Sequence, residues 1–251
     1  MKKVLIVIMI LLMLCGCKSK PVNNDPKETT SGVSCQGKDY VELMRNYKIR
    51  DKSVSAEQDN EDFAQFENDI FEEMISSSYL DMHFLVTDYK AMGLEKPEVK
   101  LRDFSYSLNT DMLDYYNGIL EDLHTFDYDK LSKKQQYDYD SLEYYCYTMM
   151  GNTCFYRYDF ILSERRNEID DMISYFTDFT FYDEESVDDY MILTKDIDRF
   201  FDNILKYTDD MAKAGYPLLD EWIDYTQEVC DDFRNKTEDN VLIVSFDQRI
   251  D

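Results

Sequence analysis

The chain has 251 residues, and its 27 Lys and Arg stand against 53 Asp and Glu, which gives a formal net charge of −26 at pH 7. A surface this acidic repels phosphate backbones, so we expect no nucleic-acid partner. Hydrophobic residues make up 44% of the chain, which contains 7 Gly and 4 Pro. This composition is too apolar for a disordered chain and too poor in turn residues for an all-β fold, and it predicts an all-α protein.

The first residues have the character of a secretion signal. Two lysines precede an apolar run at residues 4–14, which is too short to span a bilayer as a permanent helix. The sequence Leu-Cys-Gly-Cys at 14–17 resembles the lipobox of bacterial lipoproteins, in which the cysteine after the cleavage site receives a diacylglycerol. We therefore expect residues 1–16 to be a lipoprotein signal peptide. Cys17 would then be lipidated and would anchor the protein to the cell membrane, facing the outside.

A tether and a helical domain are expected after the anchor. Residues 17–58 are polar and lack a sustained period, which is typical of a flexible stalk. From residue 59 to 251 the pattern predicts a helical domain. Apolar residues at three- and four-residue spacing predict a first helix from Asp59 to Gly93, where glycine favours a stop. An extended loop is expected at 98–104.

Further helices follow in chain order. Either Asn109 or Thr110 would cap a helix that ends near residue 123. Ser132 and Gln135 match a capping box, which predicts the start of the next helix. That helix is rich in tyrosines, whose spacing favours core and boundary packing over a platform for a sugar or peptide. These tyrosines are Tyr137, Tyr139, Tyr144, Tyr145 and Tyr147.

The last third of the chain also reads as helix. Residues 165–182 predict a helix that leads into an irregular segment. A long helix would begin near Ser186 and end at Gly215, and another would cover about 218–233. The apolar run at 241–246 comes directly before the end of the sequence.

Four cysteines would remain in the mature chain, namely Cys35, Cys146, Cys154 and Cys230. Cys146 and Cys154 would be about 12 Å apart along an uninterrupted helix. This exceeds the roughly 7 Å between Cα atoms that a disulfide allows, so they could pair only if residues 151–152 break the helix. Buried free thiols are the favoured interpretation.

The motifs of common active sites are missing from the sequence. Its two histidines, His83 and His124, are expected to be structural, the first satisfied in an apolar helix and the second at a helix end. There is no HExxH, Gly-rich phosphate loop or nucleophile elbow. Acidic pairs at 188–189, 209–210 and 231–232 are expected to be solvated helix faces, since no calcium-loop pattern supports a ligand role.

Four segments, taken in order, carry a resemblance. They are YLDMHFLVTDYKAMGLEKPEVKLRDFS, TFDYDKLSKKQQYDYDSLEYY, FTDFTFYDEESVDDYMILTKDIDRFFDNIL and AKAGYPLLDEWIDYTQEVCDDF. Together they resemble a bacterial family called domain of unknown function 885, which is similar to zinc peptidases of the gluzincin-carboxypeptidase type. The resemblance implies a helical fold with a zinc site, HExxH plus a downstream Glu, in the C-terminal half.

The resemblance covers the N-terminal half of the family pattern, which continues beyond residue 251. It therefore implies an incomplete fold without the zinc ligands, so no catalytic, metal or cofactor residue is carried over to this chain. The chain also departs from the family at Glu164, Arg165 and Glu168, where family members have helix-breaking residues. A truncated domain would leave the apolar run at 241–246 without its partners.

Three hypotheses follow. The first is an anchored lipoprotein related to zinc peptidases, without peptidase activity of its own. The second is one chain of a split peptidase, completed by a partner that carries the missing half. The third is a surface binding module for cationic peptides or a protein partner, which the acidic surface would attract.

Overall fold

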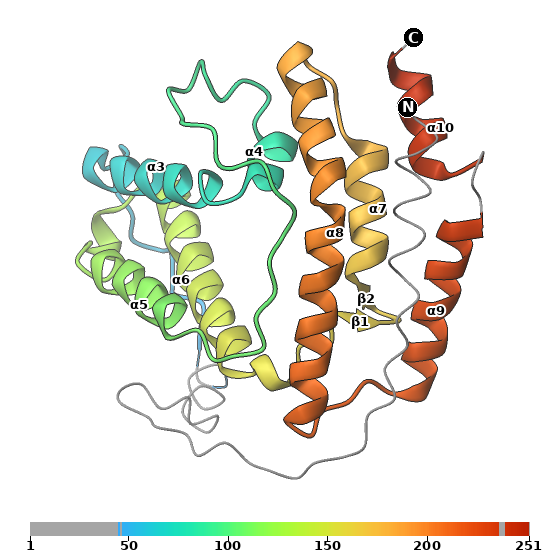
Figure 1. Ribbon diagram of the computed structural model, residues 1–251. Helices are drawn as coiled ribbons and strands as arrows, with labels where there is room; N and C mark the ends of the chain where they lie inside the picture. Colours follow the sequence, from blue (N-terminus) through green and yellow to red (C-terminus); the bar gives the residue numbers. More distant parts are fainter. Residues whose placement is uncertain (1–44, 46, 236–238, 251) are drawn as a thin grey trace. The chain divides into compact units, whose positions relative to one another are not determined.

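The computed structural model describes residues 45, 47–235 and 239–250, and Figure 1 shows their course. Cys17 and Cys35, and with them the predicted lipidation site, lie outside these residues. The described part of the chain is mostly helical with a single two-stranded hairpin, which confirms the all-α prediction.

The chain divides into two compact units. Unit 1 contains the described residues of 76–106 and 160–251, and unit 2 contains those of 26–75 and 107–159. The chain therefore passes from one unit to the other three times among the described residues, after Ile75, Tyr106 and Asp159.

Unit 2 is built from α3 (Glu61–Ile75), α5 (Thr110–Leu123) and α6 (Lys133–Cys154), of which α5 and α6 lie side by side (Figure 1). Two 3-10 turns, Tyr128–Lys130 and Tyr156–Tyr158, flank α6. The apolar faces of the three helices meet in one core. Its buried members are Phe63, Tyr116, Ile119, Leu120, Leu123, Leu131, Tyr139 and Cys146.

Two predicted helix starts in unit 2 are confirmed. The Asn109 side chain accepts a hydrogen bond from Met112 N, so Asn109 rather than Thr110 is the N-cap of α5. Ser132 and Gln135 form the predicted capping box at the start of α6. The Gln135 amide also bonds both the N–H and the carbonyl of Asn60, each at 2.8 Å, which fixes the start of α3 against α6.

The prediction of a single helix from Asp59 to Gly93 is wrong. Instead α3 ends at Ile75, and a separate helix, α4 (Tyr79–Leu85), belongs to unit 1. The cause is local, because Ser78 is extended and its hydroxyl accepts from Asp81 N, so the side chain caps a new helix. Gly93 does stop the turns after α4, with a φ of 76° that favours glycine.

Unit 1 is organised around α8 (Glu184–Lys213), which runs beside α7 (Glu168–Asp178) in Figure 1. Asp183 caps α8, two to three residues earlier than expected, and Gly215 ends it with a φ of 89°. The buried face of α8 repeats at three- and four-residue steps and supplies much of the core. Its apolar residues are Tyr190, Leu193, Ile197, Phe200, Ile204, Tyr207 and Met211.

The segment from 165 to 182 is helical and then irregular, as predicted, but its start differs. Residues 162–167 form a hairpin of β1 (Leu162–Ser163) and β2 (Arg166–Asn167), paired antiparallel. Asn167 accepts from Ile169 N and so caps α7, which explains why the helix begins only at Glu168. The favourable helix propensity of Glu164 and Arg165 is overridden by the hairpin.

The extended loop predicted at 98–104 is confirmed, and side chains of α8 hold its backbone. Leu101 N donates to Asp196 Oδ2 at 2.7 Å. Phe104 exchanges two hydrogen bonds with Asn203, one from its N–H and one to its carbonyl. The loop thus satisfies buried backbone groups without forming a strand.

The helices α9 (Asp220–Asn235) and α10 (Val241–Ile250) complete the described chain. The apolar run at 241–246 is part of α10, which packs on α7. Phe246 stacks on Tyr190 with ring centroids 5.1 Å apart, and Arg249 donates to the carbonyl of Phe176 at 2.7 Å. Val241 and Val244 are 43% and 37% exposed, so the run buries one face and leaves the other in solvent.

Candidate functional site

A cavity of about 450 Å³ lies in unit 1, between α4, the start of α8 and the loop that follows α4. Its floor consists of buried side chains from α4 and α8, and its rim of exposed ones from the loop and from residues 182–183. A volume of this size lies within the usual range for ligand pockets, about 300–1,000 Å³.

Helix α4 carries the floor because its inner residues recur at helical spacing. Tyr79, Met82 and His83 are all buried, while Asp81 between them faces solvent. Val86, the C-cap residue, continues this apolar face into the loop. The short helix is therefore an amphipathic element whose buried face forms one wall of the cavity.

His83 is the most unusual group of this wall. It is only 8% exposed, and its ring stacks on that of Phe179 with centroids 3.8 Å apart. Its Nδ1 lies 3.5 Å from the Tyr79 hydroxyl, whereas its buried Nε2 has no hydrogen-bond partner. Burial lowers the pKa of His83, and the charge of Asp189 opposes this only in part, so the imidazole is neutral. The expectation of a fully satisfied structural histidine is therefore wrong at Nε2.

Tyr79 and Asp189 join α4 to α8 at the floor. Burial raises the pKa of Tyr79 well above its ordinary value, and a hydrogen bond to Asp189 and the charge of that carboxylate raise it further. Asp189 itself is 5% exposed. The prediction that the acidic pair at 188–189 is a solvated helix face is thus wrong for Asp189.

Lys96 neutralises the carboxylates of this floor. Its ammonium group lies 2.6 Å from Glu185 Oε1 and 2.9 Å from Asp189 Oδ1. Lys90 pairs with Glu185 from the rim, and hydrogen bonds from Lys90 and Lys96 lower the pKa of Glu185 to about 2. The four side chains together form a network with two positive and two negative charges.

The remaining rim groups are polar or aromatic. Tyr182 is 47% exposed, and its ring centroid lies 5.4 Å from that of His83. The carboxylates of Asp88 and Asp183 accept backbone N–H groups of Ala91 and Ser186, each at 2.9 Å. The cavity thus combines an aromatic rim with a floor of paired charges.

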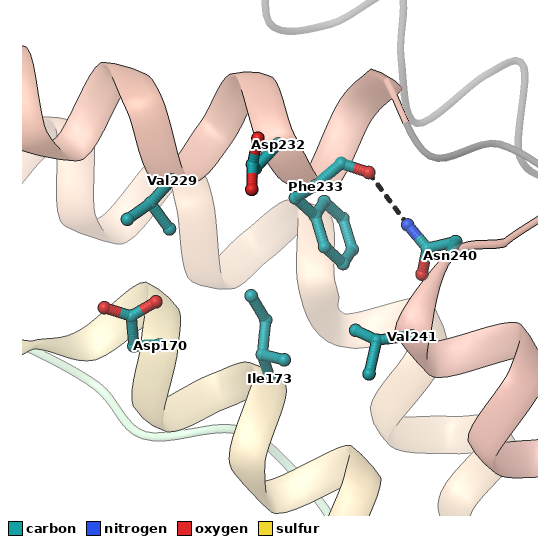
Figure 2. A pocket seen from close by; sticks show the side chains of 7 residues that line it. All are labelled: Asp170, Ile173, Val229, Asp232, Phe233, Asn240 and Val241. Carbon is teal, nitrogen blue, oxygen red and sulfur yellow. Dashed lines mark hydrogen bonds between the residues drawn. The ribbon is translucent and has the colours of Figure 1, made fainter.

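A second, smaller cavity of about 220 Å³ lies between α7, α9 and α10. Figure 2 shows that Ile173, Val229 and Val241 converge on it from the three helices. Asn240 donates to the Phe233 carbonyl at 2.8 Å, which links the start of α10 to the end of α9. Its walls are mainly apolar, which makes it a packing gap between helices more than a site for chemistry.

Unit 2 contains a cluster of ion pairs around two buried carboxylates, those of Glu143 and Asp140. Glu143 binds Arg50 through two hydrogen bonds and His124 through one, at 2.6 to 2.8 Å. Burial opposes the ionisation of Glu143, but these hydrogen bonds outweigh it and lower its pKa. Lys52 pairs with Asp140 beside it. Every charge has a partner, so we interpret this cluster as structural.

The contacts of Arg50 and Lys52 with α6 involve residues that belong to the predicted tether. The polar composition of residues 47–58 predicts that they belong to the tether, but Arg50 and Lys52 contact α6 in unit 2. Ala56 N also donates to the Leu131 carbonyl at 2.9 Å. This part of the chain therefore lies on unit 2 in the structure.

The cysteines follow the sequence interpretation in part. Cys146 is buried, and it and Cys230 are free thiols, as expected. Helix α6 is continuous to Cys154, so Cys146 and Cys154 do not pair. Cys154 is nevertheless disulfide-bonded, and the expectation of a free thiol is wrong there.

Sequence reasoning missed Tyr79, Lys96 and the burial of Asp189. The spacing of Glu185 and Asp189 by one helical turn was visible, but acidic pairs are common throughout this chain. Nothing local indicated that Lys96, in a loop, would meet them. Such a site forms through contacts between residues far apart in the sequence.

In the part of the chain that the structure describes, no three His, Cys, Asp or Glu side chains are grouped as metal ligands. No helix among the same residues has the length and apolar character needed to cross a bilayer. Comparison of the chain with protein families, with characterised proteins and with solved structures gave no match.

Proposed function

We propose that the chain is a lipid-anchored binding protein on the outer side of the cell membrane, and that the cavity of unit 1 holds its ligand. The anchor is supported by the Leu-Cys-Gly-Cys sequence that ends at Cys17. The binding site is supported by the geometry of the cavity.

The observation that carries the proposal is the buried polar floor. A buried carboxylate and a buried histidine cost free energy of desolvation, and packed apolar residues would fill the same space without that cost. Asp189 and His83 are nevertheless 5% and 8% exposed and line a cavity large enough for a small ligand. Titratable groups that are buried in a concave site beside a charged partner are therefore candidates for a functional site.

The relation to zinc peptidases remains a prediction, and we assign no hydrolytic step to this chain. A catalytic zinc needs about three protein ligands and an open position for water. A split peptidase would supply them from a second chain. Zinc content and peptide hydrolysis of the purified protein, alone and with a candidate partner, test this alternative.

The anchor is tested by cell fractionation. Cys17→Ala removes the acceptor of the lipid, so the protein should accumulate uncleaved or be released. Cys15→Ala is the matched control, because it leaves a lipobox-like Leu-Ala-Gly-Cys and should remain in the detergent phase. Equal detergent partitioning of the two variants would overturn the anchor.

The cavity is tested by a binding screen. A chemically diverse set of small polar compounds is added to the soluble domain, and binding is followed by ligand-observed NMR. Thr87→Trp places a large ring at the exposed rim and should abolish the hits. Leu205→Trp, at a site on α8 that is 65% exposed, should retain them. Absence of any hit, or hits that survive Thr87→Trp, would contradict the proposed site.

A further inference from the structure

We infer that the ligand of the cavity is a neutral, hydroxyl-rich ring such as a sugar. It would be held by the Lys96–Glu185–Asp189 network and by the exposed ring of Tyr182. This inference rests on the proposed binding function and specifies its ligand.

The charges of the cavity favour a neutral ligand. Lys96 already bridges Glu185 and Asp189, and Lys90 pairs with Glu185. The two lysines and the two carboxylates already balance one another, so a charged ligand meets no uncompensated opposite charge in this network. Burying its charge there would cost free energy of desolvation without that compensation.

Hydroxyl groups can join this network without breaking it. Each carboxylate oxygen accepts more than one hydrogen bond. Lys96 makes three hydrogen bonds to Glu185 and Asp189, whereas Lys90 makes one, to Glu185, and keeps donors for a ligand. A hydroxyl both donates and accepts, so it can bind a carboxylate and a lysine of the same pair. Adjacent hydroxyls on a ring match adjacent members of such a network.

The unpaired Nε2 of His83 favours a ligand that donates a hydrogen bond. The Tyr79 hydroxyl lies 3.5 Å from His83 Nδ1, so its oxygen accepts from this nitrogen in the tautomer that carries the proton there. A neutral imidazole that carries its proton on Nδ1 has an acceptor at Nε2. Nε2 lacks a partner, and a ligand O–H at this wall would supply one.

The rim supplies a face for the apolar side of a ring. Tyr182 is 47% exposed beside His83, and buried Met82 and Val86 line the wall nearby. Pockets for small ligands typically combine such aromatic and apolar walls with a few polar groups that fix orientation. One face of a sugar ring presents C–H groups, and its edge presents hydroxyls, which suits this arrangement.

The test uses ligands that share a ring and differ in charge. Glucose, galactose and N-acetylglucosamine are compared with anionic glucuronate and cationic glucosamine by saturation-transfer NMR and titration calorimetry. At least one neutral sugar should bind, and more tightly than both charged analogues. Tyr182→Ala should weaken binding about tenfold, equivalent to about 1.4 kcal/mol. Tyr137→Ala, at an exposed tyrosine of unit 2, should leave it unchanged.

A second pair of variants tests the network. Lys96→Met with Asp189→Asn removes one buried pair without leaving a charge alone, and should abolish binding while circular dichroism confirms the fold. Lys213→Met with Asp209→Asn removes an exposed pair of α8 and should have no effect.

The outcomes separate the two proposals. Tighter binding of glucosamine or glucuronate than of every neutral sugar would overturn the ligand class and leave the binding function standing. Sugar binding that survives both Tyr182→Ala and the Lys96/Asp189 variant would place it elsewhere and overturn this inference. If no compound of either panel binds, the proposed function falls as well.

Discussion

The rings of His83 and Phe179 stack with centroids 3.8 Å apart and planes 14° from parallel. The aromatic neighbour helps to exclude water from the imidazole, and this burial lowers the pKa of His83. We therefore expect the stability of unit 1 to depend on pH through His83.

The first prediction concerns this pH dependence. In the unfolded chain His83 takes up a proton near its ordinary pKa, about 6.5, whereas in the folded chain it does so only at lower pH. Stability should thus be complete above about pH 6.5 and fall as the pH drops toward the lowered folded pKa. His83→Phe should remove this part of the decline in urea unfolding. Met82→Leu should shift stability by the same amount at every pH, and a similar slope in wild type and His83→Phe would contradict the prediction.

The second prediction concerns the ion cluster of unit 2. Glu143→Gln should lower the free energy of unfolding by about 1–3 kcal/mol, because it weakens charged hydrogen bonds to Arg50 and His124. Urea denaturation measures the loss. Asp127→Asn removes an exposed pair with Lys130 and should change little. Equal effects of the two substitutions would mean that the buried cluster contributes no more than a surface pair.

The third prediction concerns α10. Phe246→Ala should cost about 1–2 kcal/mol, because it removes a half-buried ring that contacts Phe181 and Tyr190. Amide hydrogen exchange at 241–249 should speed up more than exchange in the middle of α8. Val244→Ala, on the exposed side of α10, should have a smaller effect. Unchanged exchange in α10 after Phe246→Ala would show that this contact does not hold the helix.

The fourth prediction concerns the thiols. Burial raises the pKa of Cys146 to about 11 and also raises the pKa of Cys230, so both should react slowly with maleimide in the native protein. Both should react at once after denaturation without reductant, whereas Cys154 should react only after reduction. If Cys15 is removed and Cys17 lipidated, Cys35 is the cysteine left to pair with Cys154. Non-reducing peptide mapping checks this, and labelling of Cys154 without reductant would refute it.

Local patterns were predictable from the sequence. The caps at Asn109 and Ser132 and the stop at Gly215 depend on residues within one helical turn. The division between α3 and α4 was missed, because apolar spacing continues across Ser78 and hides its role as a cap.

The candidate site was less predictable than the fold. Lys96 and Asp189 are 93 residues apart in the sequence. Their pairing depends on how the loop after α4 returns to α8. An acidic residue beside another acidic residue gives no local sign that it is buried. The sequence places His83 in an apolar helix, but the missing partner of its Nε2 is a property of packing that residue spacing does not encode.

Because of the way the chain passes between the units, unit 2 is completed earlier in synthesis than unit 1. Unit 2 has all its described helices once residue 159 has been made, whereas unit 1 must wait for α8 and the helices after it. Domains generally fold as units during synthesis, the earlier one first. Helix α4, with Tyr79 and His83, therefore leaves the ribosome long before its partners on α8. We therefore expect the cavity to form only after unit 2 has folded.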